Sequence, residues 1–317
     1  MQELIIEVVM IAAFAVAVGT ISSMAGIGGG IINTPLLIIV FLLSEQSAPA
    51  TALVAAFFVA VASTYAYNKQ KPKPILFKPG LFLIITTVPG SIIGVALREL
   101  ITDDYVLRVI FGVCLFPVAI KMLFARKRGK SDEVASFNFS EVPRGKLALA
   151  MFGGLVGGMS AGLLGIGGGA VVVPVLTVLL GLPIHAAVAT SMFIMMFTAA
   201  AGTARNYVGG YINPFFAITL GVGMVVGAQI GPKLARKVNP VQLKQIFGII
   251  LVFPLVKMMK LGQFLLDPLG QNLVMSTIGD IIIWLAIVVP IGLYSRIRSR
   301  RDSSVETSEP GALPRPE

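Results

Sequence analysis

Charged residues are scarce in this chain of 317 residues. They make up 13% of it, whereas a soluble domain carries about a quarter. Hydrophobic residues make up 56%, and the mean hydropathy is +0.89. This composition excludes an ordinary soluble enzyme. The apolar residues fall in long runs, such as 4–18, 81–97 and 281–293, and a helix needs about 20 such residues to cross a bilayer. The sequence therefore predicts a membrane protein.

Cysteine and histidine are almost absent, with one residue of each. Cys114 has no partner for an intrachain disulfide, and no Cys and His residues have the spacing of metal ligands. Paired-carboxylate, HExxH and GxSxG motifs are also missing, so we expect neither catalysis nor a cofactor. His185 has no acidic neighbour in the sequence, and we interpret it as a turn residue rather than a proton-coupling group.

Basic residues outnumber acidic ones by 25 to 15, which gives a formal net charge of +10. Eighteen of the 25 fall in four short segments between or after the apolar runs. Lys and Arg gather in this way in cytoplasmic loops, so the charge indicates orientation rather than a nucleic-acid partner. The four segments are 69–78, 126–146, 233–244 and 296–301.

The chain contains an internal repeat with a shift of 139 residues. GIGGG occurs at residues 26–30 and again at 165–169, and the ATAL of 50–53 meets the ATSM of 189–192. Two copies of one unit therefore make up almost the whole membrane domain. At this or a slightly smaller shift, further matches pair Pro35 with Pro174, Gly90 with Gly227 and Ile110 with Ile246.

The apolar segments predict an all-α polytopic membrane protein with two five-helix repeats and one additional C-terminal transmembrane helix. The segments at 31–43 and 170–181 are too short to span alone, so half-helices, re-entrant segments and a four-plus-four count of spans stay open. The predicted helices are 4–24, 31–43, 50–67, 81–98 and 105–124, then 147–164, 170–181, 186–204, 215–232 and 245–262, and finally 273–294.

Placing all four basic segments in the cytoplasm inverts the two repeats relative to each other, with an extracellular N-terminus and a cytoplasmic C-terminus. Inverted repeats are typical of alternating-access transporters. We divide the chain into a first repeat (1–124), a cytoplasmic linker (125–146), a second repeat (147–262), the extra helix (263–295) and a tail (296–317) that is basic and then disordered.

The two GIGGG motifs are the centre of the predicted functional site. Each precedes a short helix, and consecutive glycines let the backbone adopt unusual dihedral angles and present N–H groups. A helix start adds unpaired N–H donors and a positive dipole end, which favour an anion. The alternative is that the glycines only allow close helix packing. The predicted site glycines are Gly26, Gly28, Gly29, Gly30, Gly165, Gly167, Gly168 and Gly169.

The sequences AGIGGGIINTPLL and LLGIGGGAVVVPVL, with ATAL and ATSM after them and RNYVGGYINP at 205–214, resemble the duplicated pattern of the TauE/SafE family. The resemblance covers about residues 8–260. It implies a plasma-membrane permease that moves sulfite, sulfoacetate or a related organosulfonate, often outward. The first half has NKQKPKPILFKP where the second has a Gly-containing turn, so we do not expect strictly symmetric half-sites.

Polar side chains near the motifs are suited to binding a sulfur oxyanion, although such residues also commonly bond to helix backbone. Arg205 follows an apolar helix, where its guanidinium could either coordinate the anion or extend to lipid phosphate at the outer interface. The predicted substrate-binding side chains are those of Asn33, Thr34, Thr51, Thr190, Ser191, Arg205 and Asn206.

We therefore expect a secondary transporter that exports a small sulfur-containing anion by alternating access. The alternatives are an anion channel, which needs no alternation, and a non-transporting membrane scaffold or partner subunit. The expected partners are a small sulfur oxyanion or organosulfonate, the lipid bilayer and a coupling ion, either a proton or sodium.

Overall fold

The computed structural model of the chain describes residues 2–101, 142–235, 261–266 and 275–290 except 277, with isolated residues between 103 and 120 and between 249 and 256. All secondary structure in these residues is helical, as the sequence predicts. The chain divides into two compact units, Met1–Pro254 and Leu255–Glu317. Most of the predicted helices at 105–124 and 245–262, the linker and the tail lie outside the described residues.

Five helices of the first unit are long and apolar enough to cross a membrane. Their ends lie within about four residues of the predicted ones, and proline sets two of the starts. Pro143 and Pro183 immediately precede helices, where a fixed φ and a missing N–H cost nothing. The five are α3 (Ser47–Asn68), α4 (Phe77–Leu100), α6 (Arg144–Leu164), α8 (Ile184–Val208) and α9 (Pro214–Ala235).

Large apolar side chains remain exposed on these helices, for example Ile85 at 65%, Phe152 at 63% and Ile218 at 61%. Such residues on the outer faces of long apolar helices fit a lipid environment. α3 and α8 form the interior, because two-thirds of their most apolar stretch is buried, against less than half in α4, α6 and α9.

Two short helices follow the glycine motifs. α2 (Gly30–Ile39) has 10 residues, which corresponds to about 15 Å, or half the hydrocarbon core. α7 (Gly169–Pro174) continues as the π-helix η2 (Val175–Leu179). Both are therefore too short to span, as predicted.

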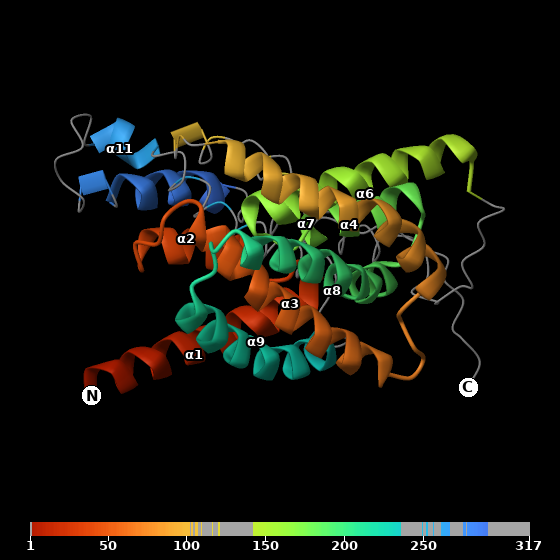
Figure 1. The fold of residues 1–317 in the computed structure, drawn as a ribbon, viewed down its shortest axis with the longest axis horizontal. Helices are drawn as coiled ribbons and strands as arrows, with labels where there is room; N and C mark the ends of the chain where they lie inside the picture. Colours follow the sequence, from red (N-terminus) through yellow and green to blue (C-terminus); the bar gives the residue numbers. More distant parts are fainter. Residues whose placement is uncertain are drawn as a thin grey trace, which may run out of the picture. The chain divides into compact units, whose positions relative to one another are not determined.

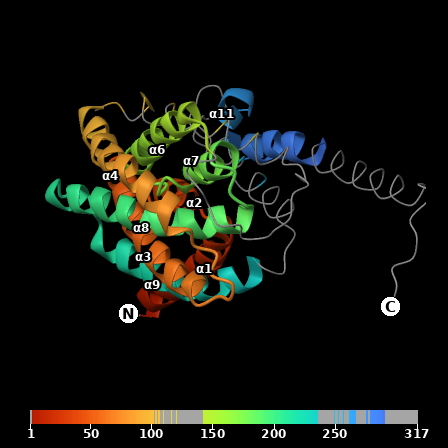
Figure 2. The same ribbon diagram turned by 90° about the vertical axis from the view of Figure 1, so that its right-hand side faces the viewer.

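The outer helices pack in two pairs. α1 (Gln2–Ala25) has its most extensive contacts with α9, and α4 with α6 (Figure 1, Figure 2). The first helix of each sequence repeat thus packs against the fourth helix of the other repeat. In Figure 1, α1 runs from left to right and α6 from right to left.

Glycine makes both pairs close. A Cβ at Gly223 would meet the Ala12 carbonyl, and one at Gly227 would meet the Val16 carbonyl, so α9 and α1 run parallel with their backbones in contact. In the other pair, Gly158 and Gly162 of α6 lie in the same way against the carbonyls of Thr87 and Ser91 in α4. Small residues spaced four apart allow this approach between membrane helices.

The second unit contains α11 (Leu261–Leu266) and a helix at Ile278–Pro290. The latter lies inside the segment 273–294 that is predicted as the last span. Its described part is shorter than a full membrane crossing.

Candidate functional site

The two glycine motifs adopt the same backbone conformation. Gly26, Gly28 and Gly29 have φ angles of 75°, 83° and 76°, and Gly165, Gly167 and Gly168 have 70°, 75° and 79°. Side chains are disfavoured in this left-handed region, which explains glycine at three of the five positions in each motif. The hydrogen bonds repeat as well, since the N–H groups of Gly26 and Gly165 both donate to the carbonyl four residues earlier.

The motifs are seated on each other. Gly30 packs so closely on Gly165 that a Cβ at position 30 would overlap the Gly165 carbonyl, and Gly169 has the same relation to the Gly26 carbonyl. Each contact becomes the other when 139 is added to one residue number and subtracted from its partner's. The structure therefore brings together, in reciprocal contact, all eight glycines that the sequence singles out.

Buried backbone donors without acceptors begin both short helices. The N–H groups of Gly28 to Ile31, and those of Gly167 to Ala170, make no hydrogen bond to any described residue. A buried donor without a partner costs about 1–3 kcal/mol. Combined with the positive dipole ends of two helices, this arrangement suits a group that brings several acceptor oxygens.

Met195 lies between the two motifs. A Cβ at Gly28 or at Gly167 would overlap its Sδ atom, and both positions also face the Cβ of Ala56, at 3.7 and 3.4 Å. Met195 in α8 and Ala56 in α3 are themselves 139 residues apart. One long thioether side chain and one methyl group therefore occupy equivalent positions beside the glycines.

Only the first motif has polar side chains beside it. Ser22 Oγ and Asn33 Oδ1 are buried and have no hydrogen-bond partner, although the Asn33 amide nitrogen donates to Met224 Sδ at 3.0 Å. A Cβ at Gly29 would lie 3.0 Å from Ser22 Oγ, which puts this hydroxyl beside the motif. Ala161 and Val172 stand at the corresponding positions of the second repeat. The two half-sites therefore differ in polarity.

The predicted hydroxyls already have backbone partners. Thr51 Oγ1 accepts a hydrogen bond from the Asn213 N–H, and Thr190 Oγ1 accepts one from the Leu76 N–H, both at 3.0 Å. These N–H groups immediately precede α9 and α4. Two further hydroxyls donate to carbonyls beside the motifs, Thr34 to Leu164 and Ser191 to Gly26.

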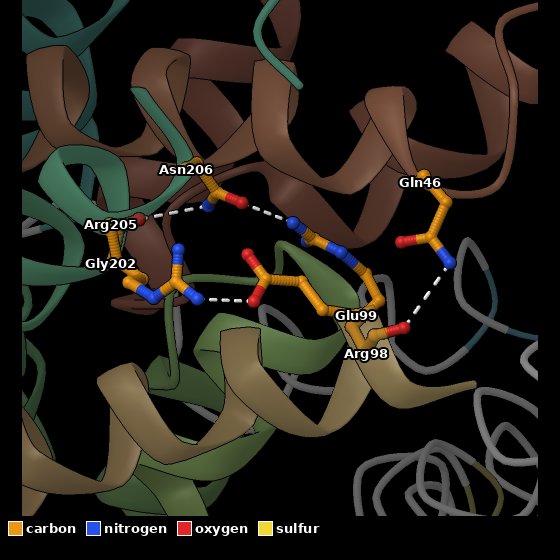
Figure 3. A network of polar contacts seen from close by, with 6 residues as sticks. All are labelled: Gln46, Arg98, Glu99, Gly202, Arg205 and Asn206. Atoms are coloured by element: carbon orange, nitrogen blue, oxygen red, sulfur yellow. Dashed lines mark hydrogen bonds and ion pairs between the residues drawn. The ribbon is translucent and has the colours of Figure 1, made fainter. Parts of the chain in front are cut away.

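Arg205 forms an ion pair with Glu99, and its side chain is 36% exposed (Figure 3). Asn206, one residue later, is fully buried, and its Oδ1 accepts a hydrogen bond from Arg98. The two residues at the end of α8 thus contact two consecutive residues at the end of α4.

Sequence reasoning missed Arg98. It is completely buried, its Nη1 donates to the Gly162 carbonyl at 3.1 Å, and its guanidinium carbon lies 5.8 Å from the ring centroid of Tyr211. Its position at the end of an apolar run is equally typical of an interfacial residue, and nothing local indicates that it turns inward. Gln46 fixes the backbone here, because its amide donates to the Arg98 carbonyl (Figure 3).

Comparison with known families agrees with this arrangement. The model of the family described as sulfite exporter TauE/SafE matches residues 11–258, which include both glycine motifs and every predicted site residue. The chain belongs to this family. It is a multi-pass membrane protein and, like its relatives, a membrane transporter.

Several curated members of the family align with most of the chain. A probable membrane transporter protein of Bacillus subtilis, YunE, is 28% identical over 264 residues, covering 77% of this chain and 94% of that protein. MJ0441 of Methanocaldococcus jannaschii, also described as a probable membrane transporter protein, is 27% identical and covers 75% and 92%. A third, from Haemophilus influenzae, is 28% identical and covers 73% and 88%. No solved structure is significantly similar.

Proposed function

We propose that the protein is a secondary transporter of a small sulfur-containing anion, such as sulfite, sulfoacetate or a related organosulfonate. The family supports the substrate class, because its model is described as a sulfite exporter. The observation that carries the proposal is the pair of interlocked glycine motifs, whose eight buried N–H groups lack acceptors among the described residues. Several donors converging beside two helix starts can replace the hydration of an oxyanion.

Alternating access is the proposed mechanism. The parallel pairs α1 with α9 and α4 with α6 are the packing expected of two repeats related by a two-fold axis in the membrane plane. In such transporters, broken helices form the site near the midplane, and one bundle moves against the other. The short α2 and α7 then act as re-entrant half-helices. An outside N-terminus, a cytoplasmic C-terminus and export across the plasma membrane complete the proposal.

Met195 is part of this site. An anion that contacts both motifs at once needs the space that its thioether occupies beside Gly28 and Gly167. A methionine side chain has three rotatable bonds and changes rotamer easily. Its movement accompanies anion entry in the proposed mechanism.

Flux measurements test the function. Purified protein in proteoliposomes should show saturable sulfite or sulfoacetate flux, with competition between the two and a response to a pH or sodium gradient that identifies the coupling ion. Conductance that does not saturate would favour the channel. Absence of flux for sulfite, sulfoacetate, sulfate and thiosulfate in correctly inserted protein would contradict the proposal.

Two glycine variants test the site. Gly28→Leu and Gly167→Leu should each abolish flux while the protein still inserts, because the new side chain fills the space between the motifs. Gly145→Leu is the control, since a Cβ at Gly145 meets no atom within 4 Å. Normal flux in both motif variants would move the site elsewhere.

A further inference from the structure

The buried cation Arg98 has only neutral partners among its described hydrogen bonds. Its guanidinium donates to the Gly162 carbonyl and to the Asn206 side-chain oxygen, and its Nε has no acceptor (Figure 3). Buried charges in proteins are normally paired with an opposite charge. The adjacent carboxylate, Glu99, forms its ion pair with Arg205 instead. These three side chains therefore carry two positive charges and one negative charge.

The repeat supplies an internal comparison for this arrangement. Gly162 and Ser23 are equivalent positions, 139 residues apart, three residues before each glycine motif. In the first half the Ser23 carbonyl accepts a hydrogen bond from the Tyr67 hydroxyl at 2.8 Å, and Tyr67 is the repeat counterpart of Asn206. A neutral hydroxyl therefore satisfies this carbonyl in one half. In the other half the carbonyl receives a full positive charge from α4.

Packing does not require the charge of Arg98, because a neutral donor satisfies the equivalent carbonyl. We propose that Arg98 is an anion subsite beside the second glycine motif, with its free Nε–H and its charge directed to a transported sulfur oxyanion. A guanidinium presents N–H groups in a planar fork that matches two oxygens of an oxyanion. The charge also raises the local concentration of anions over neutral solutes.

Asn206 is the positioning residue of this subsite. Its Oδ1 accepts from Arg98, while its amide nitrogen donates to the Gly202 carbonyl at 2.9 Å, so both ends of the side chain are fixed. Because an amide is uncharged, it orients the guanidinium without neutralising it. A carboxylate at position 206 would form a buried ion pair and compete with the substrate.

This inference rests on the proposed anion transport and is tested with the full chain and sulfite as the probe. Asn206→Asp supplies a competing carboxylate, Arg98→Gln keeps a donor for the Gly162 carbonyl without the charge, and Arg98→Lys keeps the charge. We expect the KM for sulfite to rise at least tenfold in the first two variants and only a few-fold in Arg98→Lys. The melting temperature of each purified variant without sulfite measures the structural effect separately.

The outcomes are distinct. Flux in the wild-type protein with an unchanged KM in Asn206→Asp and Arg98→Gln would overturn the subsite and leave the proposed function intact. Absence of sulfite flux in the wild-type protein would overturn both. If none of the three variants yields folded protein, the guanidinium is needed for folding rather than binding, and the inference fails.

Discussion

Gly30 lies directly against the carbonyl group of Gly165, and no side chain fits between them. The counterpart contact, Gly169 against the Gly26 carbonyl, closes the same junction from the other side. These contacts join the two repeats through backbone atoms, which cannot move as a flexible side chain can. The junction is therefore rigid at the point where both short helices begin.

Gly30→Ala and Gly169→Ala should both destabilise the protein, because the new methyl group overlaps a backbone carbonyl. Overpacking of this kind costs about 1–3 kcal/mol. The melting temperature of the purified protein in detergent checks this, with Gly145→Ala as the matched control in open space. Equal melting temperatures for all three variants would show that the junction is not closely packed.

Gly28→Ala should be partly rescued by Met195→Ala. Alanine at position 28 has two costs: a left-handed φ of 83°, at about 1–2 kcal/mol, and overlap with the Met195 thioether. Only the overlap disappears when Met195 is shortened, so the double variant should be more stable than the sum of the single changes predicts. Thermal stabilities in a double-mutant cycle measure this coupling, for which about 0.5–3 kcal/mol is typical of contacting residues.

The control for that cycle is Gly227→Ala with Met195→Ala. Gly227 packs on Val16 and Thr20 of α1, with no contact to Met195. We expect these two changes to be additive. Coupling of similar size in both cycles would mean that Met195→Ala loosens the whole protein rather than the space beside Gly28.

Thr51→Val and Thr190→Val should destabilise the protein to a similar extent, by about 1–3 kcal/mol each, because each leaves one N–H group at a helix start unpaired. Thr51→Ser and Thr190→Ser retain the hydroxyl and should remain close to wild type. Melting temperatures and sulfite KM values are compared across the four variants. A raised KM in a valine variant with unchanged stability would assign that hydroxyl to the substrate instead.

Much of the fold can be predicted from the sequence, because the signals are local. A long apolar run has to form its hydrogen bonds within one helix in a membrane, so the runs around α3, α4 and α8 fix those helices to within a few residues. The repeated GIGGG motifs likewise reveal the two chain breaks, since three glycines in each adopt positive φ angles. The short lengths of α2 and α7 follow from the apolar pattern as well.

The partners of the polar side chains could not be predicted in this way. Thr51 was a candidate for binding substrate, yet its hydroxyl accepts from an N–H group that lies 162 positions away in the sequence. Arg98 was not a candidate at all, because a lone arginine after an apolar run has the same local sequence whether it faces lipid phosphate or turns inward. Its partners lie 64 and 108 residues away.

The sequence by itself determined that this chain is a duplicated helical membrane protein of the TauE/SafE family, because hydrophobic runs, glycine motifs and the repeat can each be recognised along a single stretch of chain. Only the tertiary structure decided that Gly30 faces Gly165, that Met195 and not Ala56 fills the space between the motifs, and that Arg98 is buried against Asn206. These relations depend on how helices from the two repeats pack, and contacts over more than 100 residues leave no local pattern.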